Sequence, residues 1–250
     1  MKIWTIVITA LGLASALLLI GFVDKDESRT VCHNVIITID NQLNNHFVDN
    51  NDVRSMITNG NTEVLEGSSF NDLKVRTLEK RLVANSYVET AEIFRDLKGN
   101  LLVNVALRRP QARIVQSNGP DAYISEDGTI LPVSDKFSSR VLLISGAMAN
   151  TLTTSHNVVE AGHEKIFELI KYINADEFWR AQIAQIEVVK EDEIKLLPQV
   201  TKQYIEFGDL NNIEDKFERL GVFYSQILPA KGWNSYSRVN VKYKNQIICE

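Results

Sequence analysis

The first part of the chain is an unbroken stretch of uncharged, mostly aliphatic residues that covers residues 3–23. At about 1.5 Å per residue, a helix of this length crosses a hydrocarbon core of roughly 30 Å. A cleaved signal peptide is the alternative, with Lys2 as its charged start and Ala14-Ser15-Ala16 as its cleavage site. Cleavage there would leave an apolar stub, and the stretch exceeds the usual apolar length of about 7–15 residues. The pattern therefore favours an uncleaved transmembrane helix.

The charges on either side of this span predict its orientation. Residues 1–2 are expected to form a short cytoplasmic end, which Lys2 and the α-amino group make positive. Residues 24–29 are slightly negative in sum. Because positive flanks favour the cytoplasmic side, we expect a single-pass type II protein with the bulk of the chain outside the cytoplasm.

A compact module is predicted beyond a polar linker at residues 24–32, and it covers residues 33–110. A β-branched run at residues 35–39 predicts a strand, and two short amphipathic helices follow it. Strands at residues 87–95 and 101–107 come next, joined by a turn that contains glycine. The order is β-α-α-β-β, in which two helices can cover one face of a three-stranded sheet.

Short strands and two helices fill residues 111–250, the second predicted domain. Asp127-Gly128 between two short strands is a strong hairpin signal. Apolar residues spaced by three and four predict a late helix at residues 211–228, and a long final strand is expected at residues 236–249. The prediction is an α+β chain whose second domain is mixed α/β, with a mainly antiparallel sheet and a C-terminal edge strand.

Composition limits the classes of partner. The 250 residues include 27 Lys+Arg and 32 Asp+Glu, which gives a net charge of −5, without a long run of either sign. Nucleic-acid binding and broad adhesion to anionic lipid are therefore not expected. Cys32 and Cys249 are the two cysteines, too few for a disulfide framework. They could pair if the ends of the exported region meet, or each could be a small buried side chain.

Catalytic and metal-binding patterns are missing from the sequence. The four histidines have no metal-site spacing, and no nucleophile elbow, phosphate loop or dinucleotide fingerprint occurs. The acidic groups Glu126-Asp127 and Glu191-Asp192-Glu193 could be imagined as acid/base pairs for glycan cleavage, but both fall in predicted turns. The sequence therefore predicts a protein that is not an enzyme and that has no metal, cofactor or small-molecule substrate.

The predicted final strand is the best candidate site. Its residues alternate, with an apolar set on one side and a mostly basic set on the other: Val239, Val241 and Tyr243 against Arg238, Asn240, Lys242 and Lys244. An edge strand has unpaired backbone groups to which an extended partner can add. Lysines on an edge also deter aggregation, so pattern alone leaves both interpretations open. Trp233 lies just ahead of the strand and is of a type enriched at binding hot spots.

Several stretches, in this order, resemble the FtsQ/DivIB family of single-pass bacterial cell-division proteins. They are Leu78-Glu79 with Leu82, residues 101–105 running into Arg108-Arg109-Pro110-Gln111-Ala112, Tyr123-Ile124-Ser125-Glu126-Asp127-Gly128, residues 214–220 and residues 237–243. Ser125, Asn240 and Lys242 stand where the family usually has Asp, Asp and Arg. The resemblance extends over nearly all of the chain and implies a POTRA-like first module, a β-rich second domain and a place in the inner membrane with the bulk of the chain periplasmic.

The resemblance also implies a function. Proteins like this are non-enzymatic scaffolds of the division septum that hold an FtsB/FtsL-type subcomplex and help control septal peptidoglycan synthesis, and their POTRA-like module contacts other septal membrane proteins. On this basis we expect residues 236–246 to bind an acidic, partly extended segment of an FtsB-like protein. The expected contact residues are Trp233, Tyr236, Arg238, Val239, Asn240, Val241, Lys242, Tyr243, Lys244 and Gln246. The alternative is an unrelated single-pass envelope sensor or chaperone-like POTRA protein.

Overall fold

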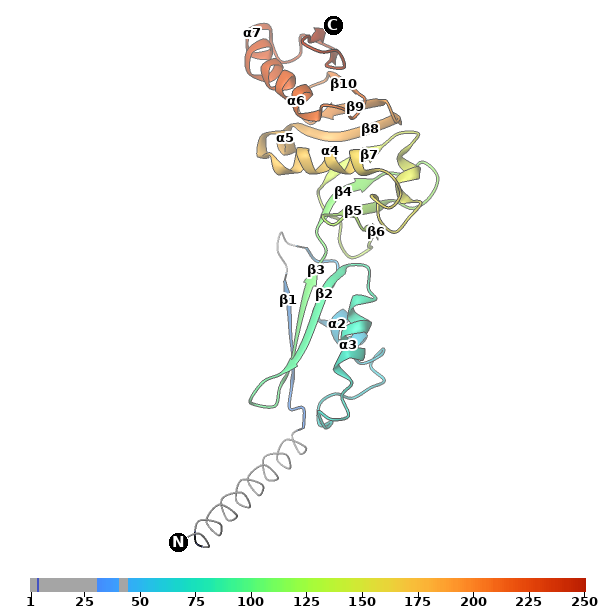
Figure 1. Ribbon diagram of the computed structural model, residues 1–250, viewed down its shortest axis with the longest axis vertical. Helices are drawn as coiled ribbons and strands as arrows, with labels where there is room; N and C mark the ends of the chain where they lie inside the picture. The colour runs from blue at the N-terminus through green and yellow to red at the C-terminus, as the bar shows by residue number, and fades with distance from the viewer. Residues whose placement is uncertain (1–3, 5–30, 41–44) are drawn as a thin grey trace. The chain divides into compact units, whose positions relative to one another are not determined.

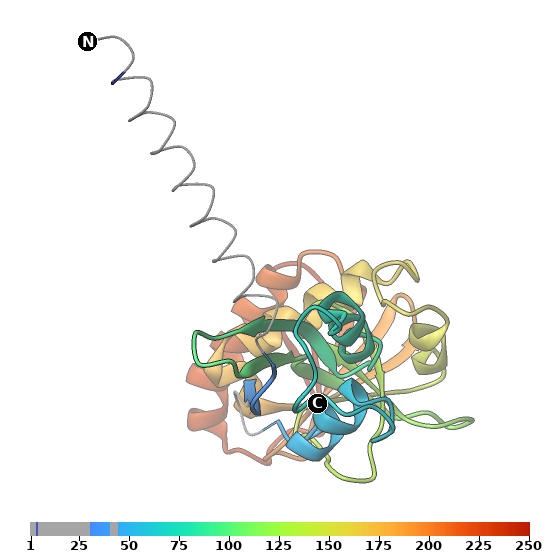
Figure 2. The same cartoon turned by 90° about the horizontal axis from the view of Figure 1, so that it is seen from below.

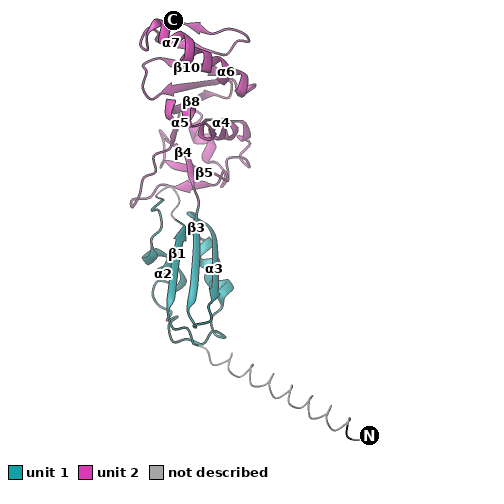
Figure 3. Ribbon diagram, turned by 90° about the vertical axis from the view of Figure 1, so that its left-hand side faces the viewer, with its two compact units in different colours: residues 1–107 teal, residues 108–250 magenta. Residues whose placement is uncertain are grey.

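The chain divides into two compact units, residues 1–107 (unit 1) and 108–250 (unit 2), which Figure 3 shows in two colours. The computed structural model describes residues 4, 31–40 and 45–250. The predicted cytoplasmic end and nearly all of the predicted membrane helix and linker lie outside the described residues. Within the described part of the chain, no helix has the length and apolar character needed to cross a bilayer.

Unit 1 has the predicted β-α-α-β-β order. Its elements are β1 (Val35–Asp40), α2 (Asn50–Ile57), α3 (Val75–Val83), β2 (Val88–Arg95) and β3 (Leu101–Leu107). The sheet order is β1-β3-β2, in which β3 is parallel to β1 and antiparallel to β2. Helix α2 begins with a capping box, because the Asp49 side chain accepts backbone N–H groups and Asp52 accepts the N–H of Asp49.

Both helices of unit 1 pack on the same face of its sheet, α2 beside β1 and α3 beside β2 (Figures 1 and 2). The strand predicted at residues 101–107 is confirmed as the central strand, and its residues Leu101, Val103, Val105 and Leu107 are all buried under the helices. The intervening side chains of β3 lie on the opposite, open face of the sheet. Leu102 is among them.

Unit 2 is built on a large mixed sheet, and most of its neighbouring strands are antiparallel, as predicted for this domain. The strands are β4 (Pro110–Ile114), β5 (Ala122–Ser125), β6 (Ile130–Pro132), β7 (Leu142–Ser145), β8 (Ile183–Lys190), β9 (Glu193–Pro198), β10 (Tyr204–Gly208), β11 (Arg238–Asn240) and β12 (Ile248–Cys249). They lie in the order β12-β11-β10-β9-β8-β7-β4-β5-β6. The pairs β4–β7, β7–β8 and β10–β11 are parallel, and the other neighbouring pairs are antiparallel.

The helical segments of unit 2 are η2 (Ala149–Thr153), α4 (Glu164–Ala175), α5 (Glu177–Gln182), α6 (Ile213–Val222), η3 (Phe223–Ile227) and α7 (Leu228–Lys231). Side chains from α4, α5 and α6 form one hydrophobic core with the strands. Gly146, at the end of β7, lets the chain approach β8 closely, because a Cβ there would lie 2.4 Å from the carbonyl oxygen of Val188. Its φ of +109° is also unfavourable for other residues.

The late helix continues further than the sequence predicted. A π-helical segment, η3, separates α6 from α7, and Pro229 lies in the first turn of α7. A proline is tolerated there because its missing N–H is not needed in a first helical turn. The helical segment therefore ends at Lys231, just before Gly232, rather than before Pro229.

Candidate partner-binding site

The C-terminal end of unit 2 differs from the predicted single strand. The chain forms β11, leaves the sheet after Val241, turns at Asn245 and returns as the two-residue strand β12. Asn245 has a φ of 58°, a left-handed conformation that asparagine tolerates. The prediction of one strand over residues 236–249 is therefore wrong. Strand β11 is paired on both sides, and β12 is the edge of the sheet.

Backbone hydrogen bonds fix how β12 presents its edge. The N–H of Glu250 donates to the carbonyl of Arg238 at 3.0 Å, and the N–H of Arg238 donates to the carbonyl of Glu250 at 3.0 Å. In an antiparallel ladder, adjacent residues direct these groups to opposite sides. The N–H and C=O of Cys249 therefore point away from β11, toward the open edge.

The alternation predicted for this segment is only partly correct. Val239 and Val241 are fully buried in the core of unit 2, as predicted. Tyr243 was predicted to lie beside them, but it is 53% exposed because the chain has already left the sheet. Asn240 was predicted to face outward with the cations, and it is buried instead.

Glu206 on β10 explains the burial of Asn240, and sequence reasoning missed it. Its carboxylate accepts a hydrogen bond of 2.8 Å from Asn240 Nδ2 and lies 3.6 Å from both Arg238 Nε and Lys242 Nζ. The pairing of β10 with β11 in parallel places these groups on one face of the sheet. The stem of Lys242 also lies over Gly208, where an added Cβ would be 2.7 Å from Lys242 Cγ.

The predicted basic outer row is correct in position for Lys242, which is exposed, and for Arg238, which is half-buried on the same face. Both, however, form an ion-pair cluster with Glu206, and Arg238 also pairs with Glu250 at 3.3 Å. Lys244 is exposed in the loop between β11 and β12, as predicted. Gln246 is exposed in the same loop.

Aromatic side chains lie at the end of the sheet where β10 and β11 begin. Trp233 is 47% exposed, and its ring centroid is 6.5 Å from that of Tyr224. Phe178 is also exposed, 5.7 Å from the Tyr224 ring. Burial raises the pKa of Tyr224 to about 12, so its hydroxyl stays protonated. Tyr236 is half-buried, with its ring 6.1 Å from that of Phe223.

The acidic turns do not form an acid/base pair. Glu126 and Asp127 lie in the β5–β6 hairpin turn, as predicted. Burial alone would raise the pKa of Asp127, but hydrogen bonds from Ser125 and Thr129 outweigh it and lower that pKa. A carboxylate held ionised in this way lacks the raised pKa of a general acid.

The β8–β9 turn contains Glu191 and Asp192, which border a hollow of about 430 Å³. Asp209 also lines this hollow, and its carboxylate accepts a 2.6 Å hydrogen bond from Lys216 that lowers its pKa. The hollow therefore gains no general acid from Asp209. The groups of three His, Cys, Asp or Glu that a metal site needs do not occur in the described part of the chain. Cys32 and Cys249 are both free thiols.

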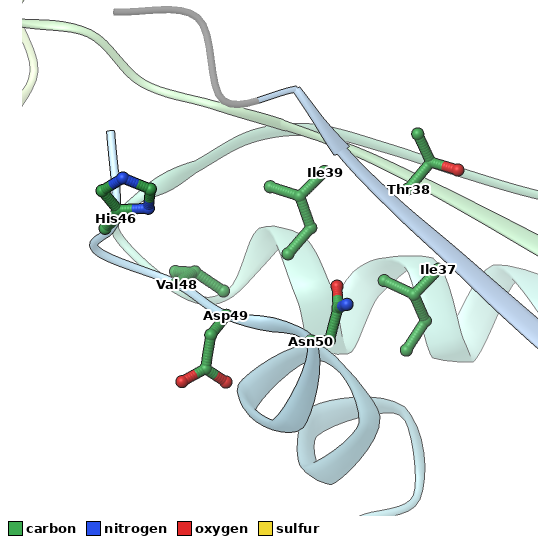
Figure 4. Close-up of a pocket in the computed structure, with 7 residues that line it drawn as sticks. All are labelled: Ile37, Thr38, Ile39, His46, Val48, Asp49 and Asn50. Atoms are coloured by element: carbon green, nitrogen blue, oxygen red, sulfur yellow. The ribbon is translucent and has the colours of Figure 1, made fainter. Parts of the chain in front are cut away.

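A second hollow, of about 410 Å³, lies in unit 1 between β1 and the start of α2 (Figure 4). Ile37, Ile39 and Val48 supply apolar walls, and Asp49 lies at its margin. The Asp49 carboxylate accepts the N–H groups of Asn51 and Asp52 in the helix cap. It therefore serves the fold and is not placed for proton transfer.

Comparison with known proteins agrees with this architecture. Residues 30–106 match a family model described as a POTRA-like domain. Residues 109–250 match a model described as FtsQ/DivIB, C-terminal related. The matched region includes β11, β12 and the aromatic residues Phe178, Tyr224, Trp233 and Tyr236. No match is found among curated proteins. The model of the C-terminal domain covers more than half of the chain, which therefore belongs to the FtsQ/DivIB-related family of bacterial cell-division proteins.

Proposed function

We propose that this protein is a non-catalytic scaffold of bacterial cell division, held in the inner membrane by one N-terminal helix, with the bulk of the chain periplasmic. In this proposal, unit 2 captures an FtsB/FtsL-type subcomplex at the septum and so helps control septal peptidoglycan synthesis. The family of the chain supports the cell-division role. Unit 1, the POTRA-like module, would contact further septal membrane proteins.

The open edge of β12 is the observation that most favours this proposal. Among the described residues, β12 has a strand neighbour on one side, β11, and the backbone of Cys249 points to the other. A strand edge of this kind can receive an extended partner segment through main-chain hydrogen bonds. Strand addition would therefore extend the sheet of unit 2 beyond β12.

Exposed side chains around this edge define the chemistry of the partner segment. Lys244 and Tyr243 project from the loop next to β12. Trp233 offers an aromatic surface for an apolar side chain. We therefore expect an extended segment with acidic residues to pair with β12 and an apolar residue to contact Trp233. Arg238 and Lys242 would act indirectly, because their cluster with Glu206 fixes β11 and hence β12.

Localisation and capture test this function. A fluorescent fusion of the full chain in dividing cells of its own bacterium should form a band at midcell. Tagged full chain, purified from membranes of the same cells, should bring down FtsB/FtsL-type proteins identified by mass spectrometry. A uniform envelope signal without these proteins would contradict the proposal and favour a sensor or chaperone-like POTRA protein.

A further inference from the structure

The open face of the unit 1 sheet has an apolar row at one end. Strand register aligns Ile36 of β1, Leu102 of β3 and Phe94 of β2 directly across the three strands. Ile36 and Phe94 are each 45% exposed. The next aligned row on this face is polar and consists of Thr38, Asn104 and Glu92. The apolar surface is thus confined to the end of the sheet where β1 begins and β2 ends.

The turn between β2 and β3 adds a fully exposed leucine at the same end. Leu97 lies at the tip of this turn, and its side chain is fully exposed to solvent. The turn is well fixed, because the Asp96 carboxylate accepts the backbone N–H groups of Lys98 at 2.8 Å and Asn100 at 2.7 Å. Leu97 is therefore held away from the body of unit 1. We name Ile36, Phe94, Leu97 and Leu102 the apolar end.

Hydrogen bonds join this turn to the chain that enters unit 1. The N–H of His33 donates to the carbonyl of Gly99 at 2.8 Å, and the N–H of Leu101 donates to the carbonyl of Asn34 at 2.8 Å. Gly99 is so close to this segment that an added Cβ would lie 3.3 Å from the carbonyl oxygen of Val31. The apolar end is thus anchored to residues 31–34.

The length of the linker limits how far this end can lie from a membrane. Residues 24–30 separate the predicted membrane span from Val31. At about 3.5 Å per residue, eight steps from residue 23 to residue 31 reach at most about 28 Å. Because the apolar end is hydrogen-bonded to residues 33 and 34, a membrane span at residues 3–23 would keep it within reach of the bilayer.

We propose that the apolar end of unit 1 lies against the lipid bilayer and inserts Leu97 into its interfacial region. The proposal rests on the membrane anchor of the proposed function. Transfer of leucine and phenylalanine side chains from water to the membrane interface lowers the free energy. The exposed Lys98 next to Leu97 would lie close to anionic headgroups. The contact is local and apolar, so it agrees with the net negative charge of the chain. It would fix the orientation of unit 1 above the membrane.

Site-specific fluorescence in proteoliposomes tests this contact. The full chain, with Cys32→Ala and Cys249→Ala, is given Leu97→Cys and labelled with an environment-sensitive fluorophore. It is reconstituted into vesicles of phosphatidylethanolamine and phosphatidylglycerol that contain nitroxide-labelled lipid. Ser86→Cys is the matched control, because Ser86 is exposed in the same unit at the opposite end of β2.

The expected result is a blue-shifted emission at position 97 with quenching about twofold or more above that at position 86. Alkaline extraction distinguishes a chain that spans the bilayer, which stays in the vesicles, from one that does not. If the chain stays in the vesicles but both positions show the same water-like emission, the membrane contact of unit 1 is contradicted and the membrane anchor is not. A chain that alkaline extraction removes from the vesicles would overturn the anchor as well. A change at position 97 that requires an added protein would assign the surface to a protein partner and contradict the proposal. Loss of partner capture by unit 2 would leave this result unaffected.

Discussion

Each unit has helices on one face of a sheet, but the opposite face of unit 1 differs from that of the terminal strands of unit 2. In unit 1 that face has an apolar row of Ile36, Leu102 and Phe94, of which Ile36 and Phe94 are each 45% exposed. In unit 2 the open face at the terminal strands is filled by Glu206 with Arg238, Asn240 and Lys242. The first arrangement leaves hydrophobic surface in water, whereas the second pairs opposite charges with one another.

This difference indicates two kinds of contact. An apolar surface that the fold does not bury is available for lipid or another apolar surface. In unit 2 the charges beside the terminal strands are paired with one another, and the free surface there is the backbone edge of β12. If the two units fold independently, a substitution in one should leave the stability of the other unchanged.

The largest effect is expected from Gly146→Ala. The new Cβ would collide with the backbone at Val188, at a φ that alanine disfavours, and we expect unit 2 to lose about 3 kcal/mol or more. Gly221→Ala is the matched control, since Gly221 is helical with open space around it, and it should stabilise unit 2 by about 0.5–1 kcal/mol. Hydrogen exchange should show the loss in unit 2 only. Equal loss of protection in β3 would contradict the independence of the units.

Glu206→Leu should have the next largest effect, a loss of about 2 kcal/mol in the free energy of unfolding of unit 2. The substitution leaves Arg238 and Lys242 without their shared carboxylate and removes the acceptor of Asn240. The side chains of Arg238 and Lys242 keep some contact with solvent, so the loss of stability should be smaller than for a fully buried ion pair. Denaturant unfolding measures it, with Lys244→Leu as a control expected to stay within about 0.5 kcal/mol. Equal effects would mean that the cluster does not stabilise β11.

Phe94→Thr should change the stability of unit 1 by only about 0.5 kcal/mol, because the ring is half exposed and threonine suits a strand. The fully buried Leu101 on the opposite face is the contrast, and Leu101→Ala should cost about 3 kcal/mol. Thermal unfolding compares the two variants. A large loss for Phe94→Thr would mean that the apolar row serves folding rather than contact.

The smallest effect concerns acid stability. The hydrogen bond from Lys216 lowers the pKa of Asp209 below its ordinary 3.8, so ionised Asp209 stabilises unit 2 above about pH 4. This contribution is lost as the pH falls through the lowered pKa of the folded state. Asp209→Asn should therefore be less stable at pH 7 and should lose less stability than the unchanged chain between about pH 4 and pH 2. Parallel pH dependences measured by denaturant unfolding would contradict this role.

Local signals in the sequence predicted most of unit 1. The β-branched run at residues 35–39 and the glycine-containing turn between the strands at residues 87–95 and 101–107 act within a few residues, and the structure confirms the elements that they indicate. The hairpin at Asp127-Gly128 belongs to the same class. Each of these features depends on neighbours along the chain, so a sequence pattern can identify it.

The terminal site depends on contacts between distant segments and was predicted less well. The Glu206 cluster requires β10 and β11 to pair in parallel, although an entire helical segment separates them in sequence. Glu206 between Ile205 and Phe207, in an otherwise apolar strand, was the available signal that this face is polar. Asn245 could have indicated the left-handed turn that ends the predicted long strand.

Capture of an FtsB/FtsL-type subcomplex by two variants of Cys249 tests the central claim most directly. Cys249→Pro removes the one N–H of β12 that points to the open edge, without removing a hydrogen bond to β11, whereas Cys249→Ala keeps it. Both variants of the full chain should fold. The account predicts that the alanine variant captures the subcomplex normally and that the proline variant loses about tenfold or more in affinity. Equal capture by the two variants would contradict strand addition at β12.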